Sequence, residues 1–152
     1  MGGCPTEWVF DAYLPEAVSD EALRLAAAHG FGIPANRVCI EADVEPTGRR
    51  CDVLVTRVTV SAPEDDVFPH TVRVFARTRG IDKVALAREI SSALGMAMVA
   101  DAAPPELEDD WMLVLPNGNY RLVTINDDES FALSPYDLAE IARTRVPAPE
   151  AA

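Results

Sequence analysis

Carboxylates are the side chains of this sequence whose number and grouping come closest to a chemical site. They gather in three short runs, at residues 64–66, 106–110 and 127–129. Grouped carboxylates serve as general acid and base, or bind magnesium and calcium. None of the runs has the ligand spacing and glycine of an EF-hand loop, and neighbouring carboxylates on a strand point to opposite faces. We therefore predict no metal site, and expect either solvated loops or a surface that binds a partner.

The predicted partner-binding residues combine these acids with one aromatic side chain. Phe68 closely follows the first run, and an aromatic anchor rimmed by carboxylates is typical of an interface hot spot. The alternative for Phe68 is a loop residue that folds back onto the core. The full set comprises Glu64, Asp65, Asp66, Phe68, Glu106, Glu108, Asp109, Asp110, Asp127, Asp128 and Glu129.

Histidine and cysteine offer little nucleophilic chemistry. A remote pair of Cys39 or Cys51 with His70 is one conceivable nucleophile and base, but no spacing marks it. His29 closes a predicted helix, where the helix dipole favours a cation. No cysteine–histidine spacing for zinc and no phosphate-binding glycine loop is present. We predict a protein that is not an enzyme, with no catalytic residue, no metal and no cofactor.

The cysteines and the apolar segments bear on the compartment. Cys39 and Cys51 lie in strand-like segments, and they could approach each other if those strands pair. Reduced thiols in a cytoplasmic protein are the simplest interpretation. No apolar stretch reaches the roughly 18 residues of a membrane span, and no secretory signal opens the sequence. We expect a cytoplasmic protein without a membrane partner.

The charge of the chain limits its partners. Among 152 residues, 25 are acidic and 13 are basic, so the formal net charge is -12. Such a field repels nucleic acid phosphates and anionic lipid, and it speeds the approach of basic proteins. We predict a basic protein partner and no nucleic acid.

A group of arginines runs against this acidity. Arg73 and Arg77 fall on one predicted strand and Arg57 on the strand before it. One interpretation is a cationic strip that binds an anionic ligand. The other is an exposed sheet face whose arginines form cross-strand ion pairs with acids.

Alternating and helical patterns predict the elements that position these residues. The predicted helices begin at Ser19, Asp82 and Ser134, which are good N-cap residues. Asn117-Gly118 between apolar runs predicts a two-residue hairpin turn. The predicted strands are 7–14, 37–44, 49–61, 70–78, 111–116 and 119–126, with a further short strand possible at 96–100.

This order predicts an α+β fold. We expect a mainly antiparallel sheet of about five to seven strands, with two or three helices packed on one face, because short turns join most neighbouring strands. A single domain is predicted for residues 1–146, followed by a disordered tail at 147–152.

The layout resembles small acidic bacterial immunity proteins, which protect cells against polymorphic or contact-delivered toxins. The resemblance rests on residues 10–15, 19–23 and 32–38, on the helix end at 94–95, and on the Trp111 hairpin after an acidic loop. It covers most of the chain as a layout. The resemblance implies a non-enzymatic protein that binds its cognate toxin, with carboxylates placed in a basic cleft and complementary charge giving fast, selective association.

Two other classes are compatible with the sequence. Type III-like secretion chaperones are small and acidic, with a helix, three strands, a helix, two strands and a final helix; residues 19–145 can be read in that order. They dimerise and hold an unfolded effector, but the first strand at 7–14 does not fit. The second class is a regulatory domain that binds a small ligand on the arginine strip. The predicted partner is thus a cognate toxin or a secreted effector, and the chain is a monomer or a homodimer.

Overall fold

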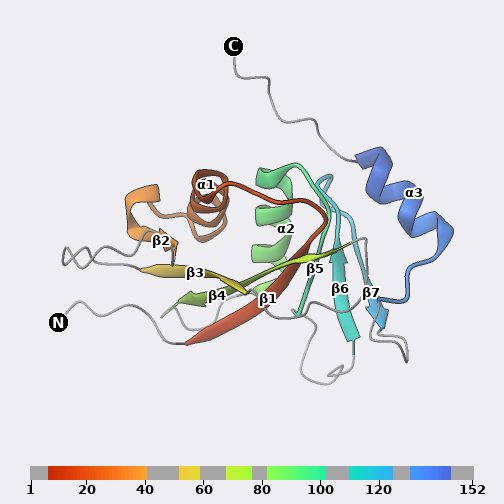
Figure 1. Ribbon diagram of the computed structural model, residues 1–152, viewed down its shortest axis with the longest axis horizontal. Coiled ribbons are helices and arrows are strands. Elements are labelled where there is room, and N and C mark those ends of the chain that lie inside the picture. The colour runs from red at the N-terminus through yellow and green to blue at the C-terminus, as the bar shows by residue number, and fades with distance from the viewer. Residues whose placement is uncertain are drawn as a thin grey trace, which may run out of the picture.

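The described residues form a single seven-stranded sheet with two helices over one face and a further helix beyond one end (Figure 1). The computed structural model describes residues 7–40, 52–58, 68–76, 82–101, 110–124 and 131–144. The strand order is β2-β3-β4-β1-β5-β6-β7, and every pairing is antiparallel except β2 with β3. The strands are β1 (Trp8–Leu14), β2 (Val38–Ile40), β3 (Val53–Val58), β4 (His70–Ala76), β5 (Met98–Ala100), β6 (Asp110–Val114) and β7 (Tyr120–Thr124).

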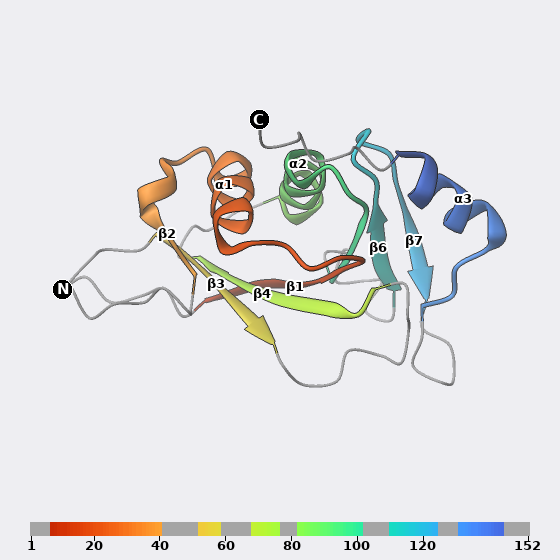
Figure 2. The same cartoon turned by 45° about the horizontal axis from the view of Figure 1, so that its top comes forward.

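Three α-helices complete the fold, and the α+β class predicted from the sequence is confirmed. They are α1 (Asp20–Phe31), α2 (Lys83–Leu94) and α3 (Pro135–Thr144), with a short 3-10 helix η1 at Ala35–Arg37. Figure 2 shows α1 and α2 side by side over one face, while α3 lies beyond β7. Ile141 of α3 packs with Leu113 and Val123, which point away from α1 and α2. The predicted tail at 147–152 lies outside the described residues.

The helices begin where their N-cap side chains predict. The Ser19 hydroxyl accepts a hydrogen bond from the Ala22 amide, and the Asp82 carboxylate accepts one from Ala85, both at 3.1 Å. In α3, the Asp137 amide donates to the Ser134 hydroxyl, and Asp137 accepts from the Ser134 amide in return, a capping box.

The end of α1 differs from the prediction. The sequence predicts a helix that His29 closes, but α1 continues to Phe31 and Gly32 takes the left-handed conformation, with φ of 68°. Gly30 serves packing instead, because a Cβ atom there would lie 2.8 Å from the Leu86 side chain on α2. The close approach of the two helices therefore leaves room for a larger residue only if the Leu86 side chain shifts.

The β6–β7 hairpin is present, but its turn is not the predicted one. The Gly118 amide donates to the Leu115 carbonyl at 2.9 Å, which makes Pro116 and Asn117 the central residues of the turn. Proline cannot take positive φ, so a turn with positive φ at both central residues is excluded. Gly118 follows with φ of 94°, and it is the residue that needs the left-handed region.

Strand alternation divides the core into two clusters. Met98, Met112 and Val114 point toward α1 and α2 and join the larger cluster. Val99 and Leu113 point to the opposite face and join a smaller cluster with Phe68 and Phe131 and neighbouring residues. We call this opposite face the aromatic face, and the side covered by α1 and α2 the helical face.

The one parallel pairing departs from the sequence interpretation. Short turns predicted antiparallel neighbours, yet β2 runs parallel to β3, with Val38 opposite Val53 and Ile40 opposite Val55. Residues 41–52 connect the two strands, and a connection of about a dozen residues is what a parallel pair needs.

Candidate functional site

Four aromatic rings form the centre of the aromatic face. Tyr13 of β1 lies edge-on to Trp111 of β6, with centroids 5.4 Å apart, and to Phe131, with centroids 5.2 Å apart. Phe131 also contacts Trp111 at 5.7 Å and Phe68 at 6.1 Å. We call Tyr13, Phe68, Trp111 and Phe131 the aromatic cluster. Edge-to-face rings at these distances attract one another beyond the burial of their surface.

Each of the three acidic runs leads directly into one ring of the aromatic cluster. Run 64–66 ends two residues before Phe68, run 106–110 ends next to Trp111, and run 127–129 ends two residues before Phe131. The side chains of the predicted acids lie outside the described residues, and of Asp110 only the backbone is described, at the start of β6. The relation between each run and its ring is therefore one of sequence position.

Phe68 is a core residue and not an exposed anchor. Its side chain is 0% exposed and packs in the smaller cluster against Phe131. The sequence left both alternatives open, and the structure has the one in which Phe68 folds back onto the core. The physical reason is the position of Phe68 just before β4, where the apolar surface of Val99 and Leu113 would otherwise face water.

Two carboxylates beside the aromatic cluster were missed by the sequence analysis. Asp11 points to the aromatic face together with Tyr13, and the amide of Asp101 donates to the carbonyl of Asp11 at 3.0 Å. Burial, and then the charge of Asp11, raises the pKa of Asp101. Burial, followed by the charges of Asp11 and Asp101, raises the pKa of Tyr13.

A signal for Asp11 was present in the sequence, whereas none existed for Asp101. The alternation of the first strand places Asp11 and Tyr13 on one face. Asp101 reaches this face only because β5 pairs with β1, and a pairing between segments so far apart leaves no local pattern.

Cations accompany these two described carboxylates. Arg73 of β4 lies opposite Asp11 on β1, and its Nε atom is 3.2 Å from the Asp11 carboxylate. The indole of Trp8 donates to Asp11 at 2.8 Å, and Lys83 lies over the Trp8 ring at 4.9 Å. In the described part of the aromatic face, these two carboxylates therefore have cationic neighbours.

The arginine strip does not form as one site. Arg73 points to the aromatic face, whereas Arg57 points to the helical face and pairs with Asp20 of α1 at 2.7 Å. Opposite orientations follow from the register, in which Arg57 lies opposite Val72 and Arg73 opposite Thr56. Arg77 lies outside the described residues. The cross-strand pair of Arg73 with Asp11 matches the interpretation as ion pairs with acids.

The histidines and Cys39 are not arranged as a nucleophile and base. Cys39 is disulfide-bonded, which corrects the expectation of reduced thiols and removes Cys39 as a nucleophile. His29 contacts Glu89 at 2.8 Å, and His70 is exposed at the start of β4. Cys51 lies outside the described residues. Within the described part of the chain, no three His, Cys, Asp or Glu residues are grouped as they would be to hold a metal ion.

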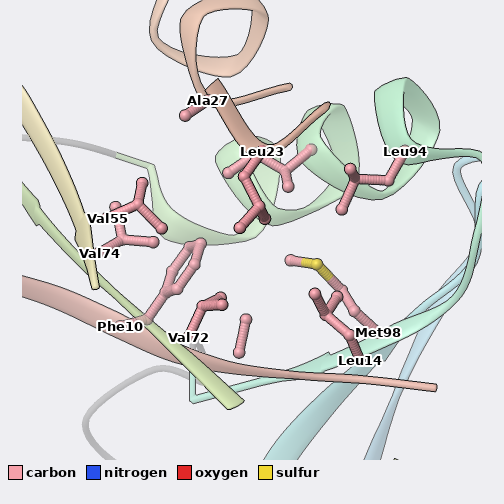
Figure 3. Close-up of a pocket in the computed structure, with 11 residues that line it drawn as sticks. Phe10, Leu14, Leu23, Ala27, Val55, Val72, Val74, Leu94 and Met98 are labelled. Carbon is pink, nitrogen blue, oxygen red and sulfur yellow. The ribbon is translucent and has the colours of Figure 1, made fainter. Parts of the chain in front are cut away.

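An apolar cavity lies inside the helical face, between α1, α2 and the sheet (Figure 3). Its volume is about 20 Å³, and its lining includes Phe10, Leu23, Val72 and Met98. A space of this size holds about one water molecule, and an apolar lining offers that water no hydrogen bond. The cavity is therefore a packing defect and not a ligand site.

No family model, curated protein or solved structure matches the chain. Among the described residues, no helix is both long enough and apolar enough to cross a membrane.

Proposed function

We propose that this chain is a non-enzymatic binding protein, and most specifically an immunity protein that neutralises a cognate toxin through its acidic runs. The observation that carries the proposal is the attachment of three acidic runs to one aromatic cluster. Ten carboxylates in three separate runs therefore lie within five residues, along the sequence, of one of its rings.

Tethering in one region changes what the charges do. Two charges 10 Å apart in water interact by about 0.4 kcal/mol, and salt screens them beyond a Debye length of about 8 Å. Carboxylates spread over the whole surface would therefore act singly on an approaching protein. Carboxylates held around one cluster add their fields, which steers a basic partner and raises its association rate.

The supporting cluster is rigid enough to present the runs. Phe68 and Phe131 are buried, and Trp111 and Tyr13 are anchored on paired strands. Loops fixed at a packed ring lose less freedom on binding than free tails do, and preorganisation of this kind raises affinity.

The two alternative classes gain no support. A ligand site on the arginine strip would need Arg57 and Arg73 on one face, and the two point to opposite faces. The chaperone layout omits the first strand, whereas β1 pairs on both sides in the middle of the sheet.

The proposal is tested with the protein encoded next to this chain's gene. Association is measured by stopped flow at several salt concentrations for the natural chain and for three run variants: Asp65→Asn/Asp66→Asn, Asp109→Asn/Asp110→Asn and Asp127→Asn/Asp128→Asn. A matched control, Glu21→Gln/Glu89→Gln, removes two exposed charges from α1 and α2.

We expect a 1:1 complex whose association rate falls steeply with salt and falls further in the run variants, roughly several-fold per variant. The control keeps the natural rate. A complex whose association rate changes neither with salt nor in the run variants contradicts the proposal. Failure to bind the neighbouring gene product contradicts it as well, and so does turnover of a small molecule by the purified chain.

A further inference from the structure

Cys39 lies in the middle of β2, the shorter of the two edge strands of the sheet. β2 has three residues and one neighbour, β3, to which three residue pairs join it. Val38 and Ile40 point into the core beneath α1, while Cys39 points to the aromatic face of β2. The Cys39 side chain is nevertheless only 8% exposed, and it is disulfide-bonded.

The disulfide adds a covalent link to the contacts that hold β2 in the sheet. At the start of the strand, Arg37 pairs with Asp52 at 2.9 Å, and the Asp52 amide donates to the Arg37 carbonyl at 2.8 Å. Arg24 of α1 donates to the Val38 carbonyl at 3.3 Å from the helical face. A covalent link at Cys39 adds a tether at the centre of the strand, and it constrains the unfolded chain as well.

We propose that the Cys39 disulfide is a structural modification of the working protein, acquired in an oxidising compartment, and that it leaves one thiol per chain unpaired. The sequence has three cysteines, so one remains when two are joined. Such links persist in secreted and periplasmic proteins and are removed in the cytosol, which replaces the cytoplasmic location expected from the sequence. This inference stands apart from the proposed function and does not depend on it.

The chemistry is thiol–disulfide exchange. Two cysteine thiols lose two protons and two electrons as the S–S bond forms. The oxidant is a disulfide of a thiol–disulfide oxidoreductase, which is reduced to two thiols in the same exchange. Because attack on the bond requires access to a sulfur atom, the burial of Cys39 protects the link from attack at the Cys39 sulfur.

The first test counts thiols. Protein is precipitated with acid from the cells that naturally make it, dissolved in denaturant, and labelled with a maleimide before or after reduction. We expect one adduct per chain before reduction and three after it, by intact mass. Three adducts before reduction overturn the proposal.

The second test measures what the link does. Reduction of the purified chain is expected to lower Tm by roughly 5–15 °C, the range that loss of a structural disulfide gives in a domain of this size. Cys39→Ser should have the lower Tm before reduction, and reduction should not change it. A natural chain whose Tm is unchanged by complete reduction overturns the structural role.

Two further variants identify the bonded cysteine. Cys4 and Cys51 lie outside the described residues, so each is replaced by serine in turn. One variant should have the same low Tm as Cys39→Ser. The other should keep the decrease in Tm on reduction and lose the single reactive thiol. If both keep the shift, Cys39 is bonded to another molecule and the link within one chain is refuted.

Discussion

Phe131 is the residue on which the aromatic cluster most depends, and its replacement gives the sharpest test. Its ring contacts Tyr13, Phe68 and Trp111, and its side chain is 3% exposed. Truncation of a buried phenylalanine to alanine costs about 3–5 kcal/mol of unfolding free energy. Phe131→Leu keeps most of the apolar volume but loses three ring contacts of about 0.5–1.5 kcal/mol each. We therefore expect about 1.5–4.5 kcal/mol for Phe131→Leu.

Urea unfolding followed by tryptophan fluorescence measures both losses, because Trp111 belongs to the cluster. With a urea slope near 2 kcal/mol per molar, Phe131→Ala should lower the midpoint by about 1.5–2.5 M. A double-mutant cycle with Phe68→Leu should show a coupling of about 0.5–1.5 kcal/mol. The control cycle uses Leu25→Ala on the exposed side of α1, where we expect additivity within about 0.5 kcal/mol. Additive effects of Phe68 and Phe131 would refute the contact that joins runs 64–66 and 127–129.

Three further outcomes test other parts of the fold. Asp137 is 1% exposed and holds α3 through the capping box and through an ion pair with Arg121 at 2.8 Å. Asp137→Ala should therefore lower the free energy of unfolding in urea by about 1–3 kcal/mol, and Ser134→Ala should lower it by about 1 kcal/mol. Burial and the charge of Asp11 raise the pKa of Asp101 above its ordinary 3.8, so the folded chain binds the proton of the Asp101 carboxyl more tightly than the unfolded chain does. The free energy of unfolding should therefore fall as pH rises through the window from 3.8 to the folded pKa. Asp101→Asn should remove that fall and leave the chain at least as stable at pH 7, which unfolding measured at several pH values checks. Gly30→Ala should lower Tm, because overpacking against Leu86 costs about 1–3 kcal/mol and outweighs the gain of about 1 kcal/mol in helix propensity. A Tm above that of the natural chain would contradict this expectation.

Features of the fold that depend on neighbouring residues were predictable from the sequence. The N-caps Ser19, Asp82 and Ser134 were correct because a cap is set by residues within one turn. The hairpin was correct as an element, although its turn type was wrong, because Pro116 excludes the positive φ that the Asn-Gly signal assumes.

Features that depend on distant pairing were not predictable. β1 lies between β4 and β5, and nothing in residues 8–14 indicates either partner. The register that turns Arg57 and Arg73 to opposite faces also comes from pairing. For the candidate site, composition located the acidic runs, but only the packing of Phe68 and Phe131 brought two of them to one place.

Concentrated negative charge has opposite consequences for folding and for binding, and this separates the two interpretations of the acidic runs. Like charges held near one another repel in the folded chain, so their neutralisation should leave stability unchanged or slightly higher. Solvated loops without a function would show only this effect. A binding surface would show the same small change in stability together with a slower association rate. Slower association without a loss of stability would therefore favour the proposed partner-binding surface, and an unchanged association rate would favour solvated loops.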